Sequence, residues 1–198
     1  MQLVFATNNL NKIKEVQALI PQHIKLLSLT DIGCLEDIPE TQETIEGNAI
    51  QKANYVKQKY GYDCFADDTG LEVETLNGAP GVYSARYAGA HRDANDNMTK
   101  LLNELENKTN REAQFKTVIA LQLNNNEYIF TGICEGVITK TKHGEKGFGY
   151  DPVFKPKGFN QTFAEMALFD KNKISHRGKA VSQLVVFLND LSQISKKQ

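Results

Sequence analysis

The sequence has few cysteines, no long apolar run and almost no net charge. Its 198 residues include Cys34, Cys64 and Cys134, with no CxxC spacing. This odd number does not fit a disulfide framework or a zinc site, so we expect three buried, reduced thiols. No run approaches the roughly 18 apolar residues that span a bilayer, and Met1–Ala6 does not resemble a signal peptide. We therefore expect a soluble, cytoplasmic protein with no membrane partner.

The formal net charge of −1 excludes a global basic field that could hold a nucleic acid polymer. Basic residues nevertheless gather toward the C-terminus. Lys155, Lys157, Lys171, Lys173, Arg177 and Lys179 stand there against only Glu165 and Asp170. Such a group is commonly a solvated face. The alternative is a local anion site, which would make sense beside an acidic metal site.

The first third of the chain alternates between strand and helix patterns. Hydrophobic residues make up 40% of the sequence, enough for one domain with an ordinary core. Apolar spacing and turn residues predict strands at 2–6, 24–29 and 63–66, and helices from residue 10 to Pro21 and over 44–60. This alternation predicts an α/β sheet with some parallel pairing.

The remainder of the chain has a different character. A helix is expected over 93–107, and two long strands over 113–123 and 127–139. Asn124-Asn125-Asn126 between these strands predicts a hairpin that extends the sheet in the antiparallel sense. A last helix is expected over 178–194. We find no internal repeat, low-complexity segment or linker.

The first candidate site lies between the first strand and the first helix. It consists of Thr7, Asn8, Asn9, Leu10, Asn11 and Lys12. A helix N-terminus presents unpaired N–H groups and the positive end of the dipole, so it binds phosphate readily, and Lys12 would add a positive charge. The alternative is an ordinary Asn or Thr cap followed by a solvent-facing lysine.

An acidic pair supplies the second candidate. Asp67 and Asp68 end the predicted strand at 63–66, and Thr69-Gly70 follows them. Adjacent carboxylates repel each other unless a cation or hydrogen bonds compensate them, and Mg²⁺ prefers hard oxygen ligands. Glu40, with Glu43 as a substitute, could complete the metal shell. The alternative is an acidic doublet in an ordinary turn.

A glycine-rich segment supplies the third candidate. Gly144–Pro152 has three glycines within six residues, which lets a backbone approach a ligand closely. Phe148 offers a ring on which a base could stack, and Asp151 offers an acceptor. The alternative is a tight loop with Phe148 in the core.

The segment Lys171–Gly178 supplies the fourth candidate. His176 and Arg177 could donate to oxygens of a base or phosphate, and Lys171 could bind phosphate. A histidine before a helix is more often structural. Together the four candidates provide a metal site, hydrogen-bond donors for phosphates, a ring for stacking and polar side chains that could contact a base. A site for a nucleoside triphosphate would require all of these.

The motifs around these residues resemble those of the inosine triphosphate pyrophosphatases. The matching segments follow one another along nearly the whole chain: Phe5–Lys12, Ala66–Leu71, Gly78–Tyr87, Gly147–Pro152 and Ser175–Gly178. The resemblance implies one elongated, two-lobed α/β domain over residues 1–198, a mixed sheet flanked by helices, with the active site in the cleft between lobes. It also implies a homodimer.

The resemblance further implies an enzyme that hydrolyses ITP, dITP and XTP to the monophosphate and pyrophosphate with Mg²⁺. Asp68 would be the general base and a magnesium ligand, Glu40 a second ligand, and Asp67 a further ligand or the group that positions its neighbour. Substrate would be bound by Thr7, Asn8, Asn9, Leu10, Asn11, Lys12, Thr69, Phe148, Gly149, Tyr150, Asp151, Lys171, His176 and Arg177.

The sequence departs from the family pattern at three positions. Asn8 stands where a glycine is frequent, and Gln42 and Gly47 stand where the family often has glycine and glutamate. Two other functions stay open. One is a pyrophosphatase for modified pyrimidine or methylated nucleotides, and the other is a nucleotide sensor without catalysis.

Overall fold

A computed structural model describes residues 1–194 of the chain, and their side chains as far as Leu191. This part of the chain forms two compact units. Unit 1 contains Met1–Asp68, Thr117–Gly132 and the chain from Arg177 onward, and unit 2 contains Thr69–Lys116 and Ile133–His176. No described helix is long and apolar enough to cross a membrane. The three cysteines are free and buried, as expected.

Helices and strands alternate in the first third of the chain, as the sequence predicts. The strands at 80–81 and 154–156 and the helix at 168–174 were not predicted. The strands are β1 (Gln2–Phe5), β2 (Lys25–Leu27), β3 (Cys64–Val73), β4 (Pro80–Gly81), β5 (Glu112–Leu123), β6 (Asn126–Ile138) and β7 (Phe154–Pro156). The helices are α1 (Leu10–Gln17), α2 (Ile45–Tyr60), α3 (Ala94–Glu104), α4 (Leu168–Ile174) and α5 (His176–Ile194). Short 3₁₀ turns occur at Thr30–Ile32, Glu74–Leu76, Ser84–Arg86 and Asp151–Val153.

The strands form a mixed sheet with the order β2-β1-β3-β5-β6-β7, and β4 pairs with β3. β1 runs parallel to both β2 and β3, whereas β4 and β7 pair antiparallel with β3 and β6. The predicted mixed α/β fold, a sheet flanked by helices, is therefore confirmed. A single two-lobed domain stays a prediction.

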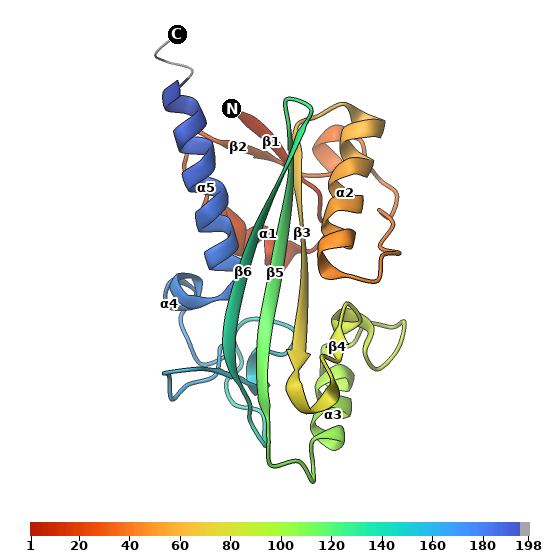
Figure 1. Ribbon diagram of the computed structural model, residues 1–198, viewed down its shortest axis with the longest axis vertical. Helices are drawn as coiled ribbons and strands as arrows, with labels where there is room; N and C mark the ends of the chain where they lie inside the picture. The colour runs from red at the N-terminus through yellow and green to blue at the C-terminus, as the bar shows by residue number, and fades with distance from the viewer. Residues whose placement is uncertain (195–198) are drawn as a thin grey trace. The chain divides into compact units, whose positions relative to one another are not determined.

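In unit 1, helices cover both faces of the sheet (Figure 1). Residues of α1 and α5, among them Val16 and Leu184, pack with Phe5 and Phe65 in one hydrophobic cluster. The rings of Phe5 and Phe65 stack at a centroid distance of 4.6 Å. α2 lies on the other face, where the Cys64 thiol donates to the carbonyl oxygen of Ala53. Consecutive residues of a strand therefore face different helices.

Unit 2 has its own core. Leu71 and Val73 of β3 pack there with residues of α3, β5 and β6, and with Phe154 and Phe163. Arg111 fixes this unit by donating to three backbone oxygens, those of Leu105, Ile138 and Thr139.

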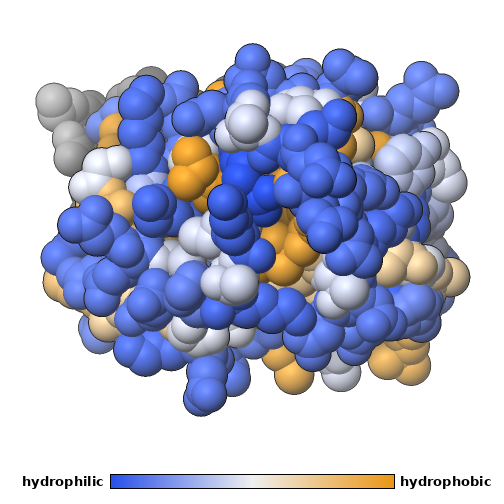
Figure 2. All heavy atoms as spheres, turned by 90° about the horizontal axis from the view of Figure 1, so that it is seen from below, coloured by the Kyte–Doolittle hydropathy of each residue, from blue (hydrophilic) through white to orange (hydrophobic). Residues whose placement is uncertain are grey.

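Viewed from below, the surface is largely hydrophilic, and hydrophobic side chains appear as separate small groups (Figure 2).

Local sequence signals explain several boundaries. The Thr44 side chain accepts from the Gly47 N–H and starts α2, and Gly61 ends that helix in the left-handed conformation at φ 76°. Asn124 and Asn125 have φ of 50° and 62°, which a tight hairpin turn requires. The predicted hairpin is confirmed.

Several predicted boundaries are wrong. The first helix ends at Gln17 and not near Pro21, and the helix predicted over 93–107 ends at Glu104. β3 does not end before the aspartates, because it continues to Val73 and carries both of them in its interior. Leu71 and Val73 bury their side chains completely in unit 2, which favours an extended chain over the turn expected at Thr69-Gly70. The last helix begins at His176, two residues before the predicted start.

Candidate active site

β3 presents its two aspartates to opposite faces of unit 1. Side chains alternate along a strand, so Asp67 points to the face that Phe65 shares with α1 and α5. Asp68 points to the face covered by α2. The sequence places the two carboxylates next to each other, but the strand directs them to different hydrogen-bond partners.

The Asp67 carboxylate is held by two cations. Its Oδ1 accepts from Lys12 Nζ of α1 at 2.9 Å, and its Oδ2 accepts from Arg177 Nε of α5 at 3.1 Å. Arg177 Nη1 also donates to Glu15 Oε2 at 2.5 Å. The side chains of Asp67, Glu15 and Arg177 are at most 6% exposed. Asp67 thus belongs to a buried network that joins α1, β3 and α5.

The Asp68 carboxylate shares one lysine with Glu40. Lys52 Nζ of α2 donates to Asp68 Oδ1 at 3.1 Å and to Glu40 Oε1 at 2.5 Å. The Lys52 side chain is 7% exposed, whereas those of Asp68 and Glu40 are 13% and 32% exposed. The structure therefore brings two of the three predicted metal ligands, Asp68 and Glu40, together beside one buried lysine. The third, Asp67, pairs with Lys12 and Arg177 instead.

Their surroundings shift the pKa values of the two aspartates in opposite directions. Burial acts to raise the pKa of Asp67, but Lys12 and Arg177 outweigh it and hold that pKa well below its ordinary value. Burial raises the pKa of Asp68, and Lys52 opposes this effect only in part. Paired carboxyl groups with divergent pKa values are typical of distinct roles, one permanently ionised and one able to exchange a proton.

Burial and the nearby carboxylates also shift the pKa values of Lys12 and Lys52. Burial lowers the pKa of Lys12, because the Asp67 charge compensates only part of the desolvation. Burial also acts to lower the pKa of Lys52, but Asp68 and Glu40 raise it overall. Lys52 is therefore a firmly charged clamp on the two carboxylates.

The predicted phosphate segment begins α1. Asn9 is the helix cap, since its Oδ1 accepts from the N–H groups of Asn11 and Lys12, and the Asn9 N–H in turn donates to Thr7 Oγ1. Asn8 and Leu10 are exposed. The capping alternative is therefore right about Asn9, but the solvent-facing lysine is wrong, because the Lys12 side chain is only 14% exposed and pairs with Asp67.

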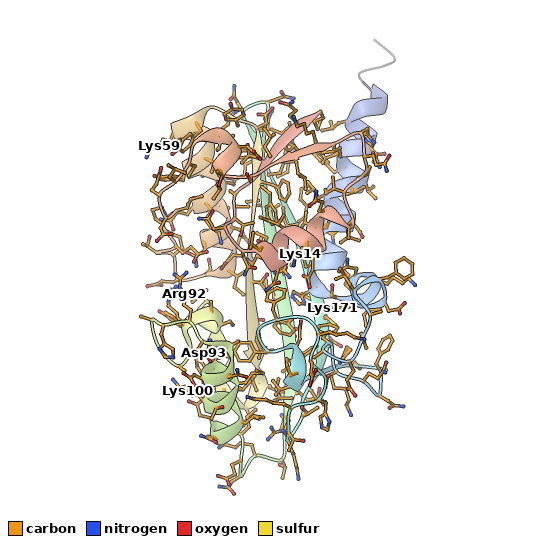
Figure 3. All side chains as sticks on the ribbon, turned by 180° about the vertical axis from the view of Figure 1, so that it is seen from behind. Lys14, Lys59, Arg92, Asp93, Lys100 and Lys171 are labelled. Atoms are coloured by element: carbon orange, nitrogen blue, oxygen red, sulfur yellow. The ribbon has the colours of Figure 1, made fainter. Side chains whose placement is uncertain are left out.

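In unit 2, a second buried ion pair lies beneath a half-buried ring. Lys171 Nζ of α4 (Figure 3) donates to Asp151 Oδ2 at 2.6 Å, and the Phe148 N–H donates to the same oxygen at 2.8 Å. Lys171 Nζ also lies 5.1 Å from the centre of the Phe148 ring. A Cβ at Gly147, whose φ is 75°, would lie 2.0 Å from Asp151 Oδ2, so only glycine fits there.

Other predicted substrate residues of unit 2 lie deeper. Tyr150 is 4% exposed and its hydroxyl donates to the carbonyl oxygen of Ser84. The His176 ring stacks on Phe115 at a centroid distance of 4.4 Å, as the structural alternative for this histidine requires. Thr69 and Gly149 are half-buried. Phe148 is not a core residue, contrary to its alternative.

Sequence reasoning missed Lys52 and Glu15. Both belong to helices with a clear apolar face. A charged residue within such a face indicates a buried ion pair, but the sequence does not show its partner. Lys52 falls in register with Asn48 and Val56 on the buried side of α2, and Glu15 adjoins buried Val16. Charged residues are almost never fully buried unless they are paired, so this register was the available signal.

A groove of about 490 Å³ lies elsewhere in unit 2. It is lined by Glu72, Val73, Glu74, Gly78, Glu112, Ala113, Gln114, Glu135 and Lys157. None of the predicted site residues lines it. The groove therefore includes none of the residues in the ion pairs of Asp67, Asp68 and Asp151.

Comparison with known proteins identifies relatives that match nearly the whole chain. The sequence is 66% identical to "dITP/XTP pyrophosphatase" from Flavobacterium psychrophilum over 190 residues, which is 96% of this chain and all of that protein. It is 50% identical to the protein of the same name from Porphyromonas gingivalis, over 94% of this chain and 97% of that one.

Solved structures also match over nearly the whole chain. The Ham1 protein of Staphylococcus aureus is 39% identical with a TM-score of 0.88, over 96% of this chain and 99% of that one. The HAM1 protein of Coxiella burnetii gives a TM-score of 0.89 at 39% identity, with the same coverage. The sequence pattern of the Ham1 family matches residues 3–187. The family resemblance expected from the motifs is confirmed, and this chain belongs to the Ham1 family.

Proposed function

We propose that this chain hydrolyses deaminated purine nucleoside triphosphates, namely ITP, dITP and XTP, to the monophosphate and pyrophosphate. The relatives that share its sequence almost from end to end carry the name dITP/XTP pyrophosphatase. One observation about the chain itself carries the proposal. The Asp67–Asp68 pair divides into one carboxylate fixed by Lys12 and Arg177 and another, with a raised pKa, beside Lys52 and Glu40.

The donor set on the α2 face suits Mg²⁺. Mg²⁺ is commonly bound by one or two carboxylates, with substrate phosphates and water completing its shell. Glu40 and Asp68 would provide those carboxylates. Among the described residues, no group of three or more His, Cys, Asp or Glu side chains is placed to hold a metal ion. Water would complete the shell of an ion on the two carboxylates when no substrate is bound. A magnesium ion there would neutralise charge on the phosphates.

Asp68 would act as the general base. Its carboxylate would accept a proton from the water that attacks the α-phosphorus, and pyrophosphate would leave. A base works best when its pKa lies near the working pH. Burial raises the pKa of Asp68 and so moves it in that direction. Asp67 would hold Lys12 in place for the phosphates, since both of its carboxylate oxygens already accept from cations.

Unit 2 would bind the base. Phe148 offers a half-buried ring for stacking, and Asp151 with Lys171 offers polar contacts beside it. Donors from the 175–177 segment would be satisfied by the O6 atom of hypoxanthine or xanthine and would face an amine in adenine, which is a strong means of rejection. Direct contacts from Tyr150, His176 and Arg177 stay predictions.

Other inferences from the sequence also stay predictions. These are the active site in a cleft between lobes, the homodimer, the cytoplasmic location and the absence of a nucleic acid partner. A pyrophosphatase for modified pyrimidine or methylated nucleotides, or a sensor that binds ITP without turnover, would be revealed by comparing the turnover of these nucleotides with that of ITP.

The attacked bond can be tested by isotope labelling. Turnover of ITP with Mg²⁺ in H₂¹⁸O should place one ¹⁸O atom in the monophosphate and none in the pyrophosphate, because water is expected to attack the α-phosphorus. Mass spectrometry of both products checks this expectation. Label in pyrophosphate would place the attack on the β-phosphorus and contradict the proposed role of the Asp68 site.

A further inference from the structure

The loop that carries Glu40 is held against one polar stripe of α2. Asn48, Gln51, Lys52 and Tyr55 are spaced i, i+3, i+4 and i+7, so they share one side of the helix. Each of them bonds to a residue of the loop that precedes the helix. Among these four side chains, that of Lys52 bonds to the Glu40 carboxylate. The other three hold the polypeptide around it.

Gln51 forms two hydrogen bonds with Thr41, the residue that follows Glu40. Its Oε1 accepts from the Thr41 N–H at 2.9 Å, and its Nε2 donates to Thr41 Oγ1 at 2.8 Å. The next backbone N–H, that of Gln42, donates to Asn48 Oδ1 at 2.9 Å. Asn48 is 2% exposed. Side chains of α2 therefore fix two consecutive peptide groups directly after Glu40.

The other end of the loop is anchored at Glu36. Its Oε1 accepts from the hydroxyl groups of Tyr55 and Tyr60 at 2.8 and 2.6 Å, and from Lys59 Nζ (Figure 3) at 2.6 Å. The bond from Lys59, with those from the two tyrosines, lowers the pKa of Glu36. Glu40 thus lies between two anchored points of the loop.

Two of the departures from the family pattern meet here, Gln42 in this loop and Gly47 in the first turn of α2. A Cβ built at Gly47 would lie 2.8 Å from Gln42 Cβ and 2.9 Å from Thr44 Oγ1. The Gln42 side chain therefore occupies the space that a larger residue at position 47 would need. The two departures compensate each other, and this loop has its own packing against the start of α2.

We propose that Gln51 is a positioning residue that sets Glu40 for metal binding. The ion pair from Lys52 attracts the Glu40 carboxylate but leaves the backbone free to move, because a lysine acts as a flexible point charge. The two bonds from Gln51 fix the adjacent peptide group instead, so the carboxylate starts close to its bound position. The inference rests on the proposed role of Glu40 as a magnesium ligand.

The test compares metal binding in variants that do not alter charge. We expect Gln51→Ala to weaken binding of Mn²⁺, a hard-ligand substitute for Mg²⁺, by about tenfold, as the loss of two hydrogen bonds would allow. Electron paramagnetic resonance of free Mn²⁺ measures this affinity in the protein without nucleotide. Hydrogen exchange should also become faster in residues 36–44 of the metal-free variant. Gln58→Ala, an exposed glutamine on the same helix, should change neither quantity.

A second pair of variants separates positioning from general damage. Thr41→Val keeps the shape of the side chain but removes its hydroxyl, so it should weaken Mn²⁺ binding several-fold. Thr41→Ser keeps the hydroxyl and should bind as the wild type does. Unchanged Mn²⁺ affinity and exchange in both Gln51→Ala and Thr41→Val would overturn the inference.

Glu40→Gln distinguishes this failure from failure of the proposed function. It should weaken Mn²⁺ binding more than any change at Gln51. If Glu40→Gln alone weakens binding, Glu40 is a ligand but Gln51 does not position it. If Glu40→Gln binds Mn²⁺ normally, Glu40 is not a ligand, and both the metal assignment and the inference are wrong.

Discussion

Replacing Asp68 by asparagine should lower kcat/KM for ITP by at least about 10³-fold while the protein stays folded. Asparagine has nearly the same shape and can still accept a hydrogen bond from Lys52, so the packing on α2 should survive. The amide, however, cannot accept the proton of the attacking water and is a poor magnesium ligand. General bases typically contribute 10²–10⁴-fold to rate, and the loss of a metal ligand adds to this.

The effect belongs to this position and not to any acid near β3. Asp63 pairs with Lys57 at 2.8 Å just before the same strand, and both side chains are partly exposed. Asp63→Asn should therefore keep most of the activity. Steady-state kinetics with circular dichroism of each variant compares the two. If Asp68→Asn retains more than a tenth of wild-type turnover, Asp68 is not the base.

The second large effect concerns stability. Arg177→Met should lower the free energy of unfolding by about 3–5 kcal/mol, the usual cost of breaking a buried ion pair from one side. Glu15 and Asp67 would lose the guanidinium that both of them contact. Arg177→Lys should recover only part of the loss, because one ammonium cannot reproduce the planar fork that reaches both carboxylates. Equilibrium unfolding in urea measures these differences.

A surface pair provides the matched control. Lys173 pairs with Asp170 at 3.2 Å, and both side chains are more than half exposed, so Lys173→Met should cost no more than about 1 kcal/mol. An equally small cost for Arg177→Met would mean that the buried network around Asp67 does not hold α1, β3 and α5 together. Arg177 would then be available for the substrate role that the family resemblance implies.

Several elements could be predicted because the necessary information is local. Thr44 and Gly61 mark the ends of α2 in the sequence, and Asn124-Asn125 marks the hairpin, since capping and tight turns depend on only a few neighbouring residues. The segment carrying Asp67 and Asp68 was identified for the same reason. These signals do not depend on which parts of the chain later meet.

The placement of the two aspartates on opposite faces of the sheet, with different partners, could not be predicted. It depends on β3 continuing past both of them, and on which helix covers each face of the sheet. Thr69-Gly70 resembles a turn unless the packing of Leu71 and Val73 in unit 2 is known. Lys52 likewise resembles any lysine of an amphipathic helix until Asp68 and Glu40 are seen to meet it.

The most direct test of the proposed function is a substrate comparison with the wild-type protein. Purified protein with Mg²⁺ should convert ITP, dITP and XTP to monophosphate and pyrophosphate at least about 100-fold faster than ATP or GTP, a ratio that mismatched polar contacts can readily provide. Equal rates across these nucleotides, a preference for modified pyrimidine or methylated nucleotides, release of orthophosphate alone, or tight ITP binding without any product would each contradict it.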